Sequence, residues 1–363
     1  MPAYIGVNGK AKTIAKVYKG NSSGKAELIF GPRGIVRSSK FVANTSTEGN
    51  NISAAHVGNY ALIGGGDMDS LKMDAYNTLL TKSSAPDLSV GRYAMTGGSV
   101  GNYALFAGGS DDTNNVVDAY NASLSKISAS KLSVARDNLA SATVGNYVLF
   151  AGGYSMFEHA YRSTVDAYNS SLTRTSAPSL RTTKEKMAGA SVGDYALFSG
   201  GYNDRYAFNT VDAYNSSLTR TAAPNLNETC ENQASTSIGN YALFGGGKGD
   251  SSVIQTVYAY NSSLTKVLAP NLSVGRLCLA ATSINHTALF AGGGHANANG
   301  DDMINSSVVD VYDSSLSKSL TSNLSIPKFF LSAVSVGNYA LFCNGGDYND
   351  KEYSDVDAYY LWE

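Results

Sequence analysis

The sequence predicts an all-β fold in which seven four-stranded antiparallel blades close into a ring, a β-propeller. Two recurring phrases and their spacing predict it. The phrase Val-Gly-Asn-Tyr-Ala-Leu-Phe-x-Gly-Gly places its tyrosine position at Tyr60, Tyr103, Tyr147, Tyr195, Tyr241, Thr287 and Tyr339. A second phrase, Asp-Ala-Tyr-Asn or a close variant, follows each of these seven copies. A period of roughly 40–50 residues is typical of propeller blades.

Each repeat contains four short β segments, named strands A to D. Strand A is the small-residue run before the glycine, such as Leu139 to Val144. Strand B is Tyr-Ala-Leu-Phe, strand C is Val-Asp-Ala-Tyr, and strand D is Leu-Thr-Arg-Thr-Ser-Ala-Pro. The Asn-Ser-Ser between C and D is a turn signal. No segment keeps a long helical period, which favours strands throughout.

The ring is expected to close through an N-terminal strand. The seventh repeat stops after its strand C, and counting back from Tyr60 puts Ile35 to Ala43 in the position of a strand D. We therefore predict that a strand at about 35–43 completes the last blade, which removes the open sheet edge. The predicted domains are a short basic β module at residues 1–31 and the propeller at residues 32–363.

The repeat resembles the kelch repeat, in which an apolar strand ends at Gly-Gly. The resemblance covers roughly residues 35–363, but the tryptophan usual in strand D is missing, since the chain has only Trp362. It implies a seven-bladed propeller of the galactose-oxidase type. Galactose oxidase holds copper with two histidines and two tyrosines, one of them cross-linked to cysteine. No such constellation is found among the scattered His56, His159, His286 and His295.

Composition narrows the function classes. The net charge of −2 gives no reason to expect nucleic acid or an anionic membrane as partner. Three cysteines, odd in number and far apart, do not make a disulfide framework or a zinc site. No apolar run is long enough for membrane insertion, and no signal-peptide core is present. We expect cytoplasmic synthesis, no cofactor and no metal. Asp111-Asp112 and Asp301-Asp302 are interpreted as solvated turns, with calcium binding as the alternative.

Length variation is confined to one kind of connection. From the start of each Asp-Ala-Tyr-Asn phrase to the next tyrosine position there are always 29 residues, whereas the distance from B to C ranges from 14 to 23. Because the strands alternate in direction, the B–C and D–A connections are expected at the same face of the ring. Function in propellers commonly resides in such variable connections.

Two neighbouring B–C connections combine aromatic and charged side chains. Those of the third and fourth blades contain the candidate ligand-binding residues Tyr154, Phe157, His159, Tyr161, Arg162, Tyr202, Asp204, Arg205, Tyr206 and Phe208. Aromatic rings pack on the apolar faces of sugars, and charged groups bond hydroxyls. The alternative is that long connections need aromatic residues to pack on each other.

A second pattern lies in the D–A connections. Eleven residues before the tyrosine position, five of seven blades have a basic residue: Arg92, Arg136, Lys184, Arg276 and Lys328. One interpretation of this basic ring is an anion-attracting rim. The other is a structural role, in which each side chain bonds neighbouring carbonyls or carboxylates.

The N-terminal segment is basic and internally repeated. Residues 1–40 hold eight Lys or Arg and one acid, Glu27, and Tyr4 to Ala11 is echoed by Tyr18 to Ala26. This resembles tandem motifs in structural proteins of phages and prophages of Gram-positive gut bacteria. The resemblance implies attachment to a virion or tail through residues 1–31. A basic hairpin packed on the propeller is the alternative.

Three functions follow from these patterns. The leading hypothesis is a non-catalytic, adhesin-like protein, a phage or prophage surface component that recognises a glycan or protein ligand at the B–C face. The second is an intracellular kelch-type scaffold for a protein partner. The third is a sugar-oxidising or isomerising enzyme.

Overall fold

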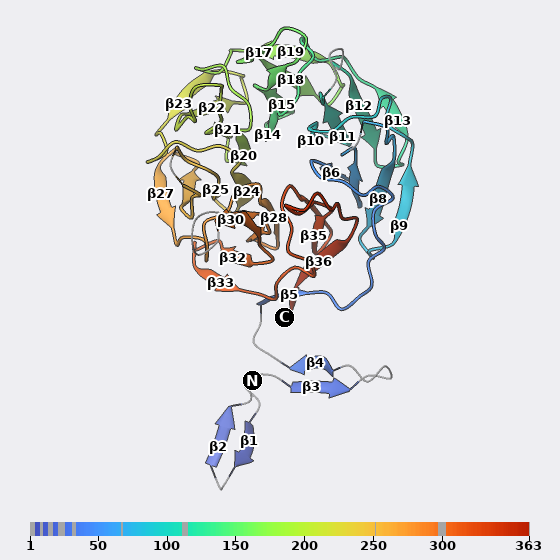
Figure 1. Cartoon of the computed structure of the whole chain (residues 1–363), viewed down its shortest axis with the longest axis vertical. Helices are drawn as coiled ribbons and strands as arrows, with labels where there is room; N and C mark the ends of the chain where they lie inside the picture. Colours follow the sequence, from blue (N-terminus) through green and yellow to red (C-terminus); the bar gives the residue numbers. More distant parts are fainter. Residues whose placement is uncertain are drawn as a thin grey trace.

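Seven four-stranded antiparallel sheets surround a central axis in the computed structural model (Figure 1). The structure describes residues 34–66, 68–110, 115–250, 252–296 and 303–362, and the backbone of four N-terminal strands. The predicted fold class is confirmed. The described residues contain no helix.

The blades follow the chain in order, each from the axis outward. Blade 1 is β6 (Ser53–Val57), β7 (Tyr60–Gly64), β8 (Met73–Asn77) and β9 (Lys82–Ala85). Blade 2 is β10 (Thr96–Val100), β11 (Tyr103–Ala107), β12 (Val117–Asn121) and β13 (Lys126–Ser128). Blade 3 is β14 (Ala140–Val144), β15 (Tyr147–Ala151), β18 (Val165–Asn169) and β19 (Arg174–Ala177). Blade 4 is β20 (Ala188–Val192), β21 (Tyr195–Ser199), β22 (Val211–Asn215) and β23 (Arg220–Ala223).

The remaining blades keep the same order. Blade 5 is β24 (Ala234–Ile238), β25 (Tyr241–Gly245), β26 (Val257–Asn261) and β27 (Lys266–Ala269). Blade 6 is β28 (Ala280–Ile284), β29 (Thr287–Ala291), β32 (Val309–Asp313) and β33 (Lys318–Leu320). Blade 7 is β34 (Ser332–Val336), β35 (Tyr339–Cys343), β36 (Val356–Trp362) and the N-terminal β5 (Gly34–Arg37).

The closing strand is shorter than predicted. β5 pairs with β36 from Gly34 opposite Trp362 to Arg37 opposite Tyr359, and Ser38 N donates one further hydrogen bond to Ala358 O. The strands D of the other blades are also only three or four residues long. The predicted range of 35–43 therefore joined a strand D to part of the D–A connection that follows it.

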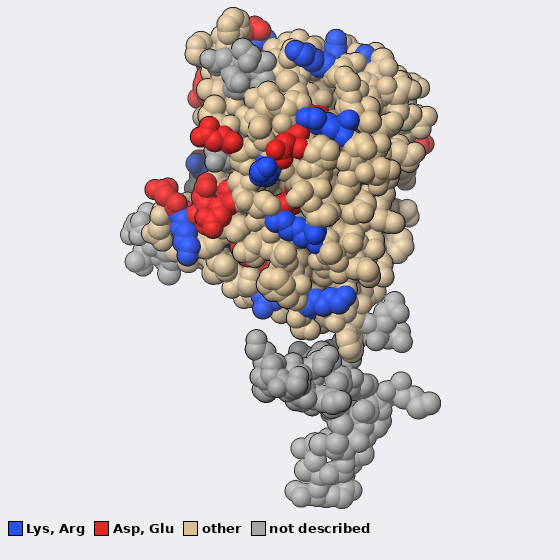
Figure 2. Space-filling model, turned by 90° about the vertical axis from the view of Figure 1, so that its right-hand side faces the viewer, with Lys and Arg blue, Asp and Glu red and all other residues tan. Residues whose placement is uncertain are grey.

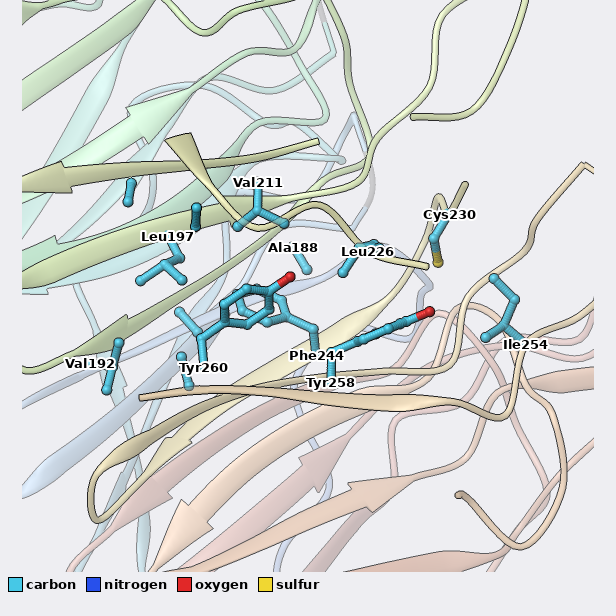
Figure 3. Close-up of a cluster of buried hydrophobic side chains, with 14 residues drawn as sticks. Ala188, Val192, Leu197, Val211, Leu226, Cys230, Phe244, Ile254, Tyr258 and Tyr260 are labelled. Atoms are coloured by element: carbon cyan, nitrogen blue, oxygen red, sulfur yellow. The ribbon is translucent and has the colours of Figure 1, made fainter. Parts of the chain in front are cut away.

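Hydrophobic cores lie between neighbouring blades. In the cluster of Figure 3, Leu197 and Val211 of blade 4 meet Phe244 and Tyr260 of blade 5, all fully buried. Each sheet is covered on both faces, so strand B is apolar at nearly every position, and even the aspartate of strand C is buried in six blades. The Tyr260 hydroxyl donates to Pro224 O at 2.7 Å, which gives the buried phenol its partner.

Four further strands precede the ring. β1 (Tyr4–Val7) pairs with β2 (Lys10–Thr13), and β3 (Val17–Gly20) pairs with β4 (Ala26–Phe30), each as an antiparallel hairpin. The two hairpins correspond to the two copies of the short N-terminal repeat. The division at residues 31 and 32 stays a prediction.

Candidate functional site

The B–C and D–A connections meet at one face of the ring, here called the loop face. Antiparallel bridges join them in consecutive blades: Asp137 with Tyr154, Glu185 with Tyr202, and Glu231 with Lys248. The bridge in blade 3 makes both of its backbone hydrogen bonds, at 2.9 and 3.0 Å. In these three blades the variable connection is thus fixed to a D–A connection of the constant framework.

The connection of blade 3 forms a small hairpin. β16 (Tyr154–Ser155) pairs with β17 (Ala160–Tyr161), and the Tyr154 and Tyr161 rings lie 5.0 Å apart, centroid to centroid. His159 closes the turn in a left-handed conformation (φ 47°), and Arg162 forms an ion pair with Glu158. At the tip, Phe157 is 73% exposed.

The connection of blade 4 is held by its own polar groups. Asn203 Oδ1 accepts hydrogen bonds from Arg205 N at 3.1 Å and Tyr206 N at 3.2 Å. The Phe208 ring packs edge-on to Tyr206, at 6.3 Å between centroids. Tyr206 is nevertheless 55% exposed. This turn therefore also presents one aromatic ring to solvent.

A hydrogen bond joins the two connections. Tyr161 Oη donates to Asp204 Oδ1 at 2.5 Å, and the pKa of Tyr161 is raised by desolvation and by this bond. The structure thus brings the candidate residues of blades 3 and 4 into one surface. Tyr154, Tyr161, Arg162, Asp204 and Phe208 make contacts within it. Phe157 and Tyr206 are exposed at its top, together with His159 and Arg205.

The basic ring lies inside the blades. Its five side chains, Arg92, Arg136, Lys184, Arg276 and Lys328, are at most 1% exposed. Three of them pair with the aspartate of strand C in their own blade: Arg92 with Asp118, Arg136 with Asp166 and Arg276 with Asp310, at 2.6 to 2.9 Å. The interpretation as an anion-attracting rim is wrong, because buried and paired cations present no field to a ligand. The structural interpretation describes all five.

The two lysines of this ring use other partners. Lys184 Nζ donates to Thr210 Oγ1 at 2.8 Å, and burial lowers the pKa of Lys184 to about 8. Lys328 pairs with Asp355 at 2.7 Å. In blade 5, Cys230 stands at the basic position, and Tyr258 replaces the aspartate of strand C. In blade 5 both the cation and the anion of this pair are thus replaced, whereas blade 1 has Gly49 at the basic position and keeps Asp74, which pairs with Lys82.

A closed ring of backbone hydrogen bonds surrounds the axis at the loop face. Seven equivalent residues of the D–A connections form this ring and are here called the rim. The backbone carbonyl of each accepts a hydrogen bond from the backbone N–H of the equivalent residue in the next blade, with 2.9 to 3.4 Å between N and O. All have φ between 50° and 54°: Asn51, Ala94, Asn138, Lys186, Asn232, Cys278 and Phe330. Sequence reasoning missed the rim, because asparagine, which tolerates this conformation, stands at only three of the seven positions.

A cavity of about 410 Å³ opens inside the rim. Tyr93 and the rim residues line it, together with the residues that follow the rim in each blade, here called the floor. The floor residues are Ile52, Met95, Leu139, Met187, Gln233, Leu279 and Leu331. The axial cavity is therefore polar at part of its rim and apolar at six of seven floor positions.

The B–C connections of the loop face have more acidic than basic groups. Among the described B–C residues the acids are Asp69, Glu158, Asp204, Asp250, Asp347, Asp350, Glu352 and Asp355, and the basic residues are Lys72, Arg162, Arg205, Lys248 and Lys351. Beside the axial cavity, burial raises the pKa of Asp137 and that of Glu185. In the side view of Figure 2, acidic side chains gather toward one face of the disc.

No group of three or more His, Cys, Asp or Glu in the described ranges is arranged to hold a metal ion. The three cysteines are buried and unpaired. Within the same ranges, no helix is long and apolar enough to cross a membrane.

These features define a seven-bladed β-propeller whose variable connections lie together at one face. The chain is similar to the solved structure of YjhT, a kelch-type propeller, with a TM-score of 0.60 and 11% sequence identity over 89% of this chain and 99% of that one. At this identity the similarity shows the fold alone. No protein-family model matches the chain, and no curated protein matches it either.

Proposed function

We propose that this protein is a non-catalytic binding protein that recognises a glycan on a cell surface through the loop face of blades 3 and 4. One observation carries the proposal: Phe157 and Tyr206, 73% and 55% exposed, stand on two connections that the Tyr161–Asp204 hydrogen bond joins. Exposed aromatic rings on a fixed backbone suit the apolar face of a sugar. Asp204, Arg205 and His159 lie within the same two connections and supply groups for its hydroxyls.

The point at which the chain enters the ring supports a tethered arrangement. In blade 7, Tyr360 of β36 pairs with Tyr339, the first residue of β35 after the A–B turn. Gly34 pairs with Trp362, two residues further along β36, and so lies at the end of the blade that carries the A–B turn. The B–C connection of the same blade begins at the other end, after Cys343. A protein attached to a virion or tail through residues 1–31 would present its loop face away from the attachment. The phage-like N-terminal motif makes this the setting we propose.

The proposal is tested by removing the two exposed rings. We expect Phe157→Ala/Tyr206→Ala to lose binding on a glycan array and on bacterial cells by about 30-fold or more, the effect of losing one hot-spot interaction of roughly 2 kcal/mol. Leu79→Ala is the matched control, because Leu79 is 70% exposed and lies in a C–D turn of the opposite face.

The outcome separates the functions. Unchanged binding by the double variant would contradict a site in blades 3 and 4. An array without any bound glycan, combined with capture of one defined protein through the same two residues, would favour a protein-interaction scaffold instead.

A further inference from the structure

Blade 7 departs from the other blades at the face that carries the A–B and C–D turns, opposite the loop face. In the other six blades a C–D turn joins strands C and D, whereas in blade 7 these two strands belong to the two ends of the chain. Its strand C, β36, is seven residues long, and that of blade 1 is five. Blade 7 therefore has no C–D turn, and its strand C continues through Leu361 to Trp362.

The missing turn leaves room beside blade 6. In six blades the A–B turn has a glycine, and a Cβ atom on it would lie only 2.7 to 3.3 Å from a side chain in the C–D turn of the next blade. Blade 6 faces blade 7 and has Asn285 in place of this glycine, with a φ of 46°. Asparagine tolerates this left-handed conformation. The space without a turn thus admits a side chain, and the side chain there is an amide.

A pocket of about 640 Å³ lies at this place, and a row of three aromatic rings lines it. Tyr339 pairs with Tyr360 across the two strands, and Trp362 follows on the same side of β36, because alternate residues of a strand share a face. Successive ring centroids are 5.9 and 6.3 Å apart. All three side chains are half-buried, so part of each ring stays open to a ligand.

The other lining residues supply uncharged hydrogen-bonding groups. Asn285 and Asn338 are exposed, and neither side chain makes a hydrogen bond to the part of the chain that the structure describes. Thr78 adds a hydroxyl group. None of the described lining residues is charged. Lys40 does not line the pocket, although its Nζ lies 5.9 Å from the centroid of the Tyr339 ring.

We propose that this pocket, here called the seam pocket, is a second carbohydrate site, which binds a neutral saccharide independently of the loop face. The row of aromatic rings packs on the apolar C–H face of the sugar, and the two amides bond its hydroxyls. The volume lies within the range of roughly 300–1,000 Å³ typical of small-molecule sites. A neutral sugar fits because the lining residues offer it amides and a hydroxyl but no charge.

The pocket contains its own reporter. Trp362 is the only tryptophan of the chain, so tryptophan fluorescence reports on the seam pocket alone. The probes are maltotriose, cellotriose and chitotriose. We expect at least one of them to change the emission of Trp362 in the full chain, with a response that saturates as the saccharide concentration rises. The loop-face variant Phe157→Ala/Tyr206→Ala should give the same response.

The test variant uses residues that the repeat itself tolerates. Tyr339→Thr/Asn285→Gly introduces the threonine that blade 6 has at Thr287 and the glycine of the other six A–B turns, and it keeps Trp362. We expect its affinity for the saccharide to fall by about 10-fold or more. Tyr147→Thr makes the same tyrosine change in blade 3, outside the pocket, and should keep the affinity. If the double variant melts at a lower temperature, Asn285→Gly alone serves instead, with an expected loss of about 5-fold.

Three outcomes would overturn the proposal. The first is no response to any probe, or an unchanged affinity in the double variant and in Asn285→Gly. The second is a response that the loop-face variant loses, because the saccharide then binds at the loop face. The third concerns the N-terminal segment: removing residues 1–30 should leave the emission and the response unchanged. If this truncation alone shifts the emission as far as the saccharide does, the pocket holds the N-terminal segment. Binding at the loop face is measured separately, so the proposed function stands in the first and third cases.

Discussion

Arg37 Nη1 lies 3.3 Å from Asp357 Oδ1, a pair that joins the two ends of the ring across 320 residues. The same contact recurs within continuous blades, where Lys82 pairs with Asp74 and Arg174 pairs with Asp166. Arg37 therefore occupies the place of a strand D residue in blade 7. The N-terminal strand reproduces the side-chain contacts of a blade as well as its backbone pairing.

Truncation tests the role of this strand. Removing residues 1–44 deletes β5 and exposes the edge of β36 and the apolar contacts of Ile35, so we expect unfolding or aggregation. Removing residues 1–30 leaves β5 in place, and the melting temperature should stay close to that of the full chain. Thermal unfolding of both truncations measures the difference. Equal melting curves would contradict closure by β5.

Closure and blade number were predictable because the sequence repeats its framework seven times. The role of the basic ring was harder to predict, since a row of Arg and Lys has the same spacing whether it points to solvent or to strand C. One signal was available in blade 5, where Cys230 and Tyr258 replace both members of the pair together. The rim had no such signal, because a left-handed backbone is imposed there on Ala94, Lys186 and Phe330 as well as on asparagine.

The buried pair of Arg276 and Asp310 allows a double-mutant cycle. Both side chains are fully buried, with 2.6 Å between Nη2 and Oδ2. Arg276→Met alone leaves the buried Asp310 carboxylate without its guanidinium partner and should lower the free energy of unfolding by about 3–5 kcal/mol. Adding Asp310→Asn should recover part of this loss, because the amide can still accept from Ser273. Urea denaturation of Arg276→Met, Asp310→Asn and the double variant measures the three losses, and additive losses would contradict a coupled pair.

Asp137 predicts a pH dependence of stability. Burial raises the pKa of Asp137 above its ordinary 3.8, so the folded state holds the proton to higher pH than the unfolded state does. The free energy of unfolding therefore falls as the pH rises from about 3.8 through the pKa that Asp137 has in the folded protein. Asp137→Asn removes the charge, and Asn can still accept from Asn138 Nδ2. We expect the variant to be more stable than the unmodified protein at pH 7, and the gain to disappear near pH 4. A gain independent of pH would contradict this assignment.

The central claim is that ligand binding occurs at the loop face. The direct test is hydrogen–deuterium exchange of the protein alone and of the protein with the glycan that binds most tightly on an array. Binding should slow exchange in residues 152–164 and 200–210, the B–C connections of blades 3 and 4, and leave the C–D turns at Asn169–Leu172 and Asn215–Leu218 unchanged. Protection confined to these turns or to the N-terminal hairpins, with none in the two connections, would contradict the account.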